Sequence, residues 1–297
     1  MLVIGLFGPT ASGKSDVAAA VGKLIPAEVV SADAMQVYES VPILTNRSAN
    51  PERLVGVWPL SHVASVGEYA PLAQAAIDEI LEAGRTPLVV GGTGLYFRAA
   101  LADLRLPPAP VPGTRERWEQ LYDEAGANAA HARLGELDSA AAARIHPNDR
   151  RRVVRALELA EAGRSLVPAR QALFAGACRH PTLLVGLDVP KPVLDGRIAE
   201  RTRRMFEAGV ADEVRKALVA EPSVTARKII GLHEVATLPR KEAIEELIVR
   251  TRRYAAYQRK WLRRLEGLVI VAADRPPEET AAEIVALART RERLPRS

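Results

Sequence analysis

The chain has 297 residues, enough for one large domain or for one domain with a sizeable insertion, and 48% hydrophobic and 26% charged residues are ordinary values for a globular protein. No apolar run approaches the roughly 20 residues of a membrane span, and the single cysteine, Cys178, excludes an internal disulfide and a multi-cysteine zinc site. The net charge of +5 is modest, but 34 of the 41 basic residues are arginine, which an Arg-rich genome and a polyanionic partner explain equally well. We expect a cytoplasmic protein with no membrane segment and no signal peptide.

The first apolar run, Leu2–Phe7, leads through a short loop into Asp16–Val21, which has helical character. Gly, four residues, then Gly-Lys-Ser between a strand and a helix is the P-loop pattern. In such a loop the backbone N–H groups and the positive end of the helix hold phosphate oxygens, the lysine reaches the terminal phosphate, and the serine hydroxyl ligates Mg²⁺. A glycine-rich turn with an unrelated lysine is the alternative. The pattern predicts a di- or triphosphate site, with ATP the default ligand, formed by Gly8, Pro9, Thr10, Ala11, Ser12, Gly13, Lys14 and Ser15.

A second apolar run, Ala27–Ser31, predicts another parallel strand, and Asp33 lies just beyond its end. In open α/β sheets ligands bind at the carboxyl ends of the strands, so this carboxylate is placed to activate a hydroxyl or to help bind Mg²⁺. The same side chain can instead cap a helix that begins near Ala34. The local sequence favours these two roles equally.

A second glycine turn follows later in the core. Residues 41–62 are expected to form a loop over the sheet, after which a helix is predicted over Pro71–Ala83 and a buried strand over Pro87–Val90. Gly91–Tyr96 then forms a glycine turn between that strand and another helix. Thr93 in this turn either donates to a substrate oxygen or satisfies the turn itself, and the local sequence favours the second role.

The composition changes at Leu106–Pro112, which holds four prolines in seven residues. From Thr114 to about Phe174 the chain is rich in Ala, Arg and Glu, with helical periodicity and no strand candidate. We therefore expect an α/β core over residues 1–110 and 180–297, and an all-helical insertion over residues 111–179.

The insertion carries a cluster of arginines at the predicted start of a helix that Asp149 can cap. Cations at this end of a helix oppose its dipole at a cost of about 0.3–1 kcal/mol each, so the cluster indicates an external polyanion such as nucleic acid. A solvated helix face is the alternative. The cluster consists of Arg150, Arg151, Arg152 and Arg155.

Strand character returns at Leu183–Asp188, and the next helix carries Arg197, Arg201 and Arg204 on one face. An arginine near a P-loop can neutralise charge on a leaving phosphate, although spacing alone does not choose among these three.

A long helix is predicted over Glu242–Leu265, before a last strand over residues 268–271 and a helix over about residues 277–289. It has an aromatic face, more typical of a core than of a base-stacking platform, and a basic face that is a candidate nucleic-acid track. The aromatic face consists of Tyr254, Tyr257 and Trp261, and the basic face of Arg252, Arg259 and Arg263. The five histidines show no metal-ligand spacing.

Taken in order, these motifs resemble the tRNA dimethylallyltransferase family, also called tRNA isopentenyltransferases, in its bacterial form without a zinc finger. The resemblance runs from about residue 3 to residue 272, nearly the whole chain. It is carried by residues 8–15, Ser31–Tyr38, Gly91–Tyr96, His146–Arg150, Arg155–Glu158, Arg197–Met205, Thr251–Tyr254, Gln258 and Trp261.

The resemblance implies a P-loop NTPase-like core, in which helices flank a central parallel sheet, with an all-helical insertion. It implies transfer of a dimethylallyl group from dimethylallyl diphosphate to N6 of adenosine 37, next to the anticodon of tRNA, with release of diphosphate. Asp33 matches the family's general base, Thr93 and Arg201 match residues that contact the diphosphate, and Lys14 and a Mg²⁺ ion on Ser15 hold that diphosphate in the P-loop.

The resemblance also assigns contacts with the tRNA anticodon stem-loop, and nothing in the sequence suggests an obligate oligomer, so we expect a monomer. Two segments depart from the family pattern: Pro42–Ser48 replaces a usual Asp-Ile-Gly-Thr-Ala-Lys-Pro, and Leu232 replaces a usual tyrosine. The positions matched to tRNA contacts are Asp33, Ala34, Met35, Gln36, Thr93, Arg115, Arg151, Arg152, Val153, Val154 and Arg155.

Two other functions need fewer of these features. A P-loop kinase of a small metabolite needs only the loop and Asp33, and a prenyltransferase acting on free adenine nucleotides does not need the insertion. The arginine-rich helical insertion favours a tRNA acceptor over both, and it favours an isoprenoid diphosphate over ATP in the P-loop.

Overall fold

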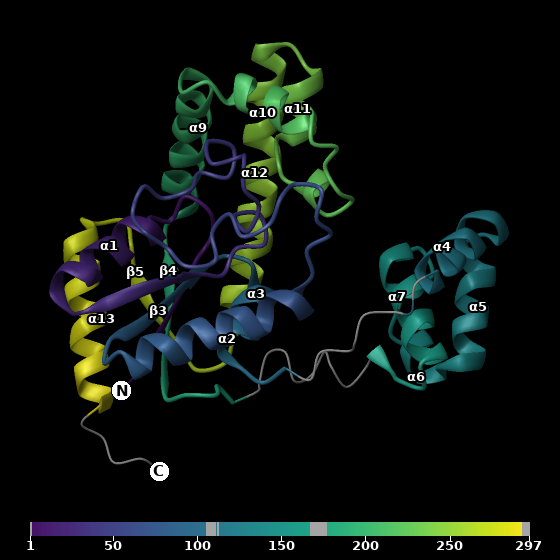
Figure 1. Ribbon diagram of the computed structural model, residues 1–297, viewed down its shortest axis with the longest axis horizontal. Helices are drawn as coiled ribbons and strands as arrows, with labels where there is room; N and C mark the ends of the chain where they lie inside the picture. The colour runs from purple at the N-terminus through teal and green to yellow at the C-terminus, as the bar shows by residue number, and fades with distance from the viewer. Residues whose placement is uncertain (1, 105–110, 112, 167–176, 293–297) are drawn as a thin grey trace. The chain divides into compact units, whose positions relative to one another are not determined.

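The chain folds into two compact units, and the computed structural model describes residues 2–104, 111, 113–166 and 177–292. One unit comprises Met1–Asp103 and Ala177–Ser297, and the other comprises Leu104–Gly176. The sequence placed the two junctions at residues 110 and 179. The first unit is an α/β core and the second is helical (Figure 1).

The core is built on a five-stranded sheet in which all neighbouring strands are parallel, which confirms the predicted fold class. Every residue of the central strand is buried, because a parallel sheet covered on both faces needs continuous apolar strands. Because β1 and β3 are parallel neighbours, the two glycine-rich turns that follow them lie at the same edge of the sheet. Across the sheet the strands are β2 (Ala27–Ser31), β3 (Thr86–Gly91), β1 (Val3–Phe7), β4 (Thr182–Asp188) and β5 (Leu268–Ala272).

Helices cover both faces of this sheet (Figure 1). On one face α1 (Lys14–Leu24) packs against α13 (Pro277–Glu292), and Ile4 of β1 belongs to their shared core. On the other face α2 (Val66–Glu82) packs against α3 (Gly94–Leu101). Phe97 of α3 contacts Phe7 of β1, with ring centroids 5.2 Å apart. Successive side chains of a strand point to opposite faces, so the continuous apolar run of β1 serves both cores.

Four helices lie between β4 and β5: α9 (Lys191–Glu207), α10 (Val210–Leu218), α11 (Leu232–Thr237) and α12 (Arg240–Leu262). The long helix predicted from the sequence is α12, which packs against α9 and α11 (Figure 1). Buried Glu234 of α11 ion-pairs with Arg250 of α12 and accepts a hydrogen bond from the backbone of Gly231, so it fixes α11 onto α12. In the described part of the chain, no helix combines the length and apolar character needed to span a membrane.

One predicted helix start was wrong, and one of the two alternatives considered for Asp33 is not found. The helix predicted over Pro71–Ala83 begins earlier, at Val66, because Ser65 and Glu68 form a capping box that starts it before the proline. No helix begins near Ala34: the carboxylate of Asp33 accepts a hydrogen bond from Met35 N at 2.9 Å and closes a turn instead.

The helical unit comprises α4 (Thr114–Ala125), α5 (Ala127–Leu137), α6 (Ser139–Ala142) and α7 (Arg150–Glu161). Its core contains Leu134, Ile145, Val153 and Leu157. Asp149 caps α7 as predicted, accepting from Arg152 N at 3.3 Å. The predicted continuation of helical structure towards Phe174 and the four prolines of Leu106–Pro112 lie outside the described residues.

The two chain segments that flank the helical unit are paired within the core. Ala102 and Cys178 form an antiparallel bridge, and Arg179 N donates a hydrogen bond to Leu101 O at 2.8 Å. The helical unit therefore departs from the core and returns to it at neighbouring positions.

Candidate active site

The P-loop connects β1 to α1 in a conformation that its residue types dictate. Gly13 has a φ of 88° and Ala11 a φ of 63°, both in the left-handed region. A Cβ at Gly8 would lie 2.7 Å from Ser12 Oγ, so only glycine fits there. The Lys14 ammonium donates to Pro9 O at 2.8 Å, which folds the side chain back over the loop. The loop thus presents backbone N–H groups and one cation at the N-terminus of α1.

The structure selects Arg201 as the arginine hydrogen-bonded to the P-loop. Its Nη2 donates to Thr10 Oγ1 at 2.8 Å, and Thr10 N donates to Gln258 Oε1 at 2.7 Å. Arg197 also lies near the loop, with Nη1 3.9 Å from the Cβ position of Gly13, but it donates to Ala273 O. Arg204 is exposed and pairs with Glu200 on its own helix.

Asp33 and Thr93 meet beside the P-loop because the second glycine turn packs directly on the turn after β2. A Cβ at Gly91 would lie 2.2 Å from Ala32 O, so the two backbones are in contact. Thr93 Oγ1 accepts from Ala34 N at 3.2 Å and lies 3.3 Å from the Tyr254 hydroxyl. Although Thr93 precedes α3, its hydroxyl makes no capping bond to that helix. The hydroxyl instead connects the Asp33 turn to α12.

The site has an excess of positive charge, which favours the binding of an anion. Burial lowers the pKa of Lys14 to about 8, although the carboxylate of Asp33 acts in the opposite direction. Burial likewise lowers the pKa of Arg201. In the described part of the chain neither cation forms an ion pair, and the buried Ser12 Oγ and Arg201 Nε have no hydrogen-bond partner. Buried cations and polar atoms without partners are costly, and a bound phosphate would satisfy them.

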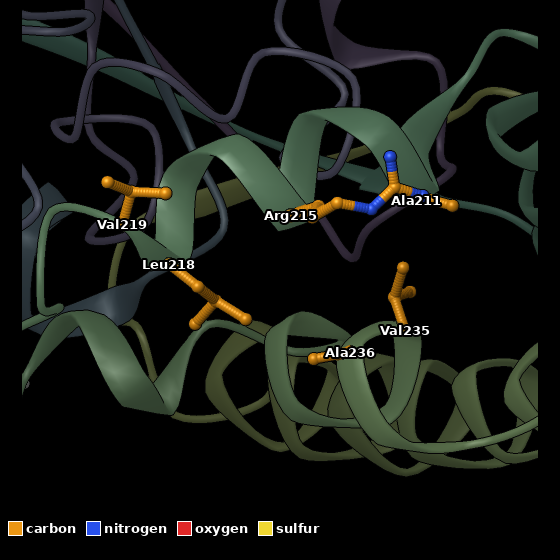
Figure 2. A pocket seen from close by; sticks show the side chains of 6 residues that line it. All are labelled: Ala211, Arg215, Leu218, Val219, Val235 and Ala236. Atoms are coloured by element: carbon orange, nitrogen blue, oxygen red, sulfur yellow. The ribbon is translucent and has the colours of Figure 1, made fainter.

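A pocket with a mixed lining opens next to these residues, and Thr10, Asp33 and Arg201 contribute to it. The rest of the lining comes from the loop after β2, from α9, from the segment before α11 and from α12. Its apolar members are Met35, Leu44, Met205, Ile229, Ile230 and Leu247, and its polar members are Thr45, Asn46, Thr202, Thr251 and Tyr254. A ligand with an anionic head and a small hydrocarbon tail matches this lining. A second hollow lies between α10 and α11 and contains no P-loop residue (Figure 2).

The remaining residues matched to tRNA contacts lie in the helical unit. Arg115 and Arg155 both pair with buried Glu158 at 2.7 Å, and Arg152 pairs with Asp149 at 3.3 Å. Only Arg151 of this set is exposed with no acidic partner in the described residues. Acidic side chains of the same unit therefore neutralise most of this arginine cluster. Of the unpaired positive charge expected from the sequence, mainly that of Arg151 is left.

The buried members of that set have a different place. The side chains of Val153 and Val154 are buried, and Val153 belongs to the core of the unit. Their side chains are therefore not part of the surface of the unit.

Two arginines of the basic face expected on α12 form partly exposed ion pairs with other elements of the α/β unit. Arg252 pairs with Asp195, and Arg259 pairs with Asp188 at 3.3 Å. On the aromatic face, Trp261 is buried as predicted, whereas Tyr257 is 54% exposed, contrary to the prediction. Sequence reasoning gave no role to Gln258, although a buried polar residue between two aromatic residues at helical spacing was a signal for one.

Fold and site together define a P-loop group-transfer enzyme, in which a phosphate cradle, a carboxylate and a small pocket of mixed lining meet at one edge of a parallel sheet. The sequence model of the IPP transferase family matches residues 36–265. The chain is similar to the tRNA dimethylallyltransferases of Thermobifida fusca, 40% identical over 88% of this chain and 87% of that protein, and of Anaeromyxobacter dehalogenans, 40% identical over 96% and 99%.

Comparison with solved structures gives the same result as the sequence comparisons. The tRNA isopentenylpyrophosphate transferase of Bacillus halodurans matches with a TM-score of 0.70 and 30% identity over 98% of this chain and 96% of that chain. A eukaryotic dimethylallyltransferase acting on tRNA matches with a TM-score of 0.80 and 25% identity, over 98% of this chain and 78% of that chain. The chain belongs to the IPP transferase family of tRNA dimethylallyltransferases, the transferases that modify tRNA with a dimethylallyl group.

Proposed function

We propose that this protein transfers the dimethylallyl group of dimethylallyl diphosphate to N6 of adenosine 37, next to the anticodon of tRNA, and releases diphosphate. The observation that carries the proposal is the pocket beside the P-loop. Thr10 of the P-loop, Arg201 and Asp33 line it together with six apolar side chains, which suit the hydrocarbon of a five-carbon group.

The reaction forms a bond between adenine N6 and the first carbon of the dimethylallyl group while the bond from that carbon to the diphosphate oxygen breaks. The electron pair of the broken bond goes to the diphosphate. Because N6 is a poor nucleophile and an allylic carbon ionises readily, stabilising the leaving group is the main task of the site. Lys14, Arg201 and the N–H groups of the P-loop supply that stabilisation.

The two carboxylate oxygens of Asp33 have different roles. One carboxylate oxygen, Oδ1, accepts from Met35 N and fixes the turn. The other oxygen makes no hydrogen bond with any described residue, so it is available to accept the amino proton of adenine. A correctly placed base of this kind contributes about 10²–10⁴-fold to the rate. We propose that Thr93, which is fixed between Ala34 N and Tyr254, donates to the bridging oxygen of the diphosphate.

We propose that Mg²⁺ is the metal cofactor and that Ser15 holds it together with the diphosphate. Ser15 lies in the first turn of α1, and its hydroxyl makes no hydrogen bond with a described residue, so an oxygen ligand is available. In the described residues no group of three His, Cys, Asp or Glu side chains could hold a metal by itself. This fits Mg²⁺, which usually binds through one protein oxygen and substrate phosphates, and which would neutralise charge on the diphosphate.

For tRNA, we propose that the turn with Asp33, Ala34, Met35 and Gln36, together with Thr93, contacts the modified nucleotide. The exposed arginines of the helical unit, Arg115, Arg151 and Arg152, together with the half-buried Arg155, contact the anticodon stem-loop, whereas buried Val153 and Val154 make no side-chain contact with it. Exposed Arg151 is best suited to a phosphate, because no acidic side chain of the described unit competes for it. The enzyme acts as a monomer in the cytoplasm, where its substrate tRNA is found.

The test offers purified protein, Mg²⁺ and labelled dimethylallyl diphosphate to tRNA and to AMP in parallel, with a tRNA that carries guanosine at position 37 as the control. Label on the unaltered tRNA alone is the expected result. Label on AMP but not on tRNA would instead identify a prenyltransferase of free nucleotides. Phosphate transfer from ATP to a small metabolite, without prenyl transfer, would identify a kinase.

A further inference from the structure

We infer that Gln258 is a positioning residue. It fixes the position of the P-loop relative to the second glycine turn, so that Arg201 and Thr93 act on the same diphosphate. The inference rests on the proposed function of the P-loop. It concerns a side chain that neither binds the substrates nor takes a proton.

Gln258 connects two loops that are far apart in the sequence. It is 2% exposed, and both ends of its amide are used: Oε1 accepts from Thr10 N at 2.7 Å, and Nε2 donates to Gly92 O at 3.0 Å. Buried polar groups need such partners, and a side chain that must accept and donate at this length is best supplied by glutamine. The P-loop and the second glycine turn are thus tied to one point on α12.

The glycines of the second turn show how closely α12 approaches. A Cβ at Gly92 would lie 2.2 Å from Gln258 Nε2, and a Cβ at Gly94 would lie 2.1 Å from the ring of Trp261. Tyr254, Gln258 and Trp261 occupy one face of the helix, at spacings of four and three residues, and each contacts the turn. Because Gly92 and Gly94 have no side chain, α12 can pack directly against the backbone of this turn. Glycine is therefore needed here for helix packing as well as for any approach of a phosphate.

Thr10 connects Gln258 to the catalytic arginine, because it contacts both Gln258 and Arg201. Its backbone N–H is directed to Gln258 and so is not offered to phosphate, while its hydroxyl accepts from Arg201. Gln258 therefore sets the place of Thr10, and Thr10 sets the direction of the Arg201 guanidinium. Stabilisation of the leaving group depends on donors that are fixed before the reaction. Weakening the contacts from Gln258 through Thr10 to Arg201 should therefore lower kcat more than it weakens tRNA binding.

The test replaces Gln258 with methionine, which has a similar length and volume but can neither donate nor accept as the amide does. Gln258→Met is expected to lower kcat roughly 100-fold, with an unchanged KM for tRNA. Gln74→Met is the matched control, because Gln74 also donates to backbone carbonyls, those of Ala99 and Ala102, but lies on α2 outside the site. This control should keep full activity.

A double-mutant cycle separates positioning from a general structural role. If Gln258 acts through Thr10 and Arg201, Gln258→Met should cost less than about 5-fold when Arg201→Ala is already present. Gln258→Glu is a second variant, which keeps an acceptor for Thr10 N but replaces the donor to Gly92 O with a charged carboxylate oxygen. It should show the same non-additive loss, which keeps the test valid if the methionine variant does not fold.

The inference is overturned if both Gln258 variants retain half of the wild-type kcat or more, or if their losses add fully to that of Arg201→Ala. It is also overturned if Gln74→Met loses as much activity as Gln258→Met. An inactive wild-type protein would contradict the proposed function itself, so the two failures are distinguishable.

Discussion

Replacing Lys14 with methionine should abolish donor binding and at the same time stabilise the fold. Lys14 is enclosed in the P-loop with only a neutral carbonyl as its hydrogen-bond partner, and burial lowers its pKa from an ordinary 10.5 to about 8. The cost of keeping this ammonium charged without an anion corresponds to at most roughly 3 kcal/mol at neutral pH. Since the side chain retains some access to water, about 1–2 kcal/mol is the expected gain from Lys14→Met.

The sign of the pH dependence follows from the lowered pKa. Between about pH 8 and pH 10.5 the unfolded chain binds more protons than the folded protein, so this group makes stability rise with pH over that window. Diphosphate binding needs the charged ammonium and should change in the opposite direction. From pH 7 to pH 9.5 the charged fraction of Lys14 falls roughly 30-fold, and donor affinity should fall with it.

The assay is calorimetric titration with an unreactive donor analogue, whose phosphates are fully ionised above about pH 7.5, together with thermal unfolding. Wild-type protein should lose affinity above pH 8 and take up a proton on binding, and Lys14→Met should raise Tm by about 3–6 °C. Lys23→Met, an exposed change on the same helix, should alter neither. A donor affinity that does not vary between pH 7 and pH 9.5, or a lower Tm in Lys14→Met, would refute the account of a buried cation awaiting its anion.

Three further changes test other parts of the site. Asp33→Asn keeps an acceptor for Met35 N but removes the base, so single-turnover transfer should slow by about 10²–10⁴-fold while tRNA affinity is kept; a parallel loss of affinity would favour a purely structural role. Arg151→Ala should reduce the salt dependence of tRNA binding by about one unit of slope, and an unchanged slope would remove this side chain from the interface. Gly94→Ala should lower the free energy of unfolding by about 2–4 kcal/mol, because its Cβ would meet the Trp261 ring. Gly196→Ala, with open space around it inside α9, is the control without a clash and should raise the free energy of unfolding by about 0.5–1 kcal/mol in denaturant unfolding.

The sequence predicted the core of the fold because its strands are buried on both faces and therefore appear as continuous apolar runs. All five predicted strands are present in one parallel sheet. The start of α2 was missed because the capping box formed by Ser65 and Glu68 was not considered, although its local hydrogen bonds decide where the helix begins. Local chemistry of this kind can be read from a sequence when both residues of the pair are considered.

The site was harder to predict because it depends on contacts between distant segments. Spacing placed Arg197, Arg201 and Arg204 on one face of α9, and only the fold shows that Arg201 bonds to Thr10. The arginines of the helical unit looked unpaired because Glu158, which neutralises two of them, is three residues from one and 43 from the other. Charge balance across such separations is a property of the folded chain.

The pairing of Ala102 with Cys178 has a consequence for how this protein tolerates change. Because the two ends of the excursion through the helical unit are joined at the core, the core requires only that they meet, and not that the intervening chain has a given length. Closing a loop costs entropy that grows only logarithmically, by about 0.6 kcal/mol for each doubling of its length. Insertions and deletions between these two residues should therefore change the stability of the sheet little. The helical unit can vary in length without a change in the site at the strand ends.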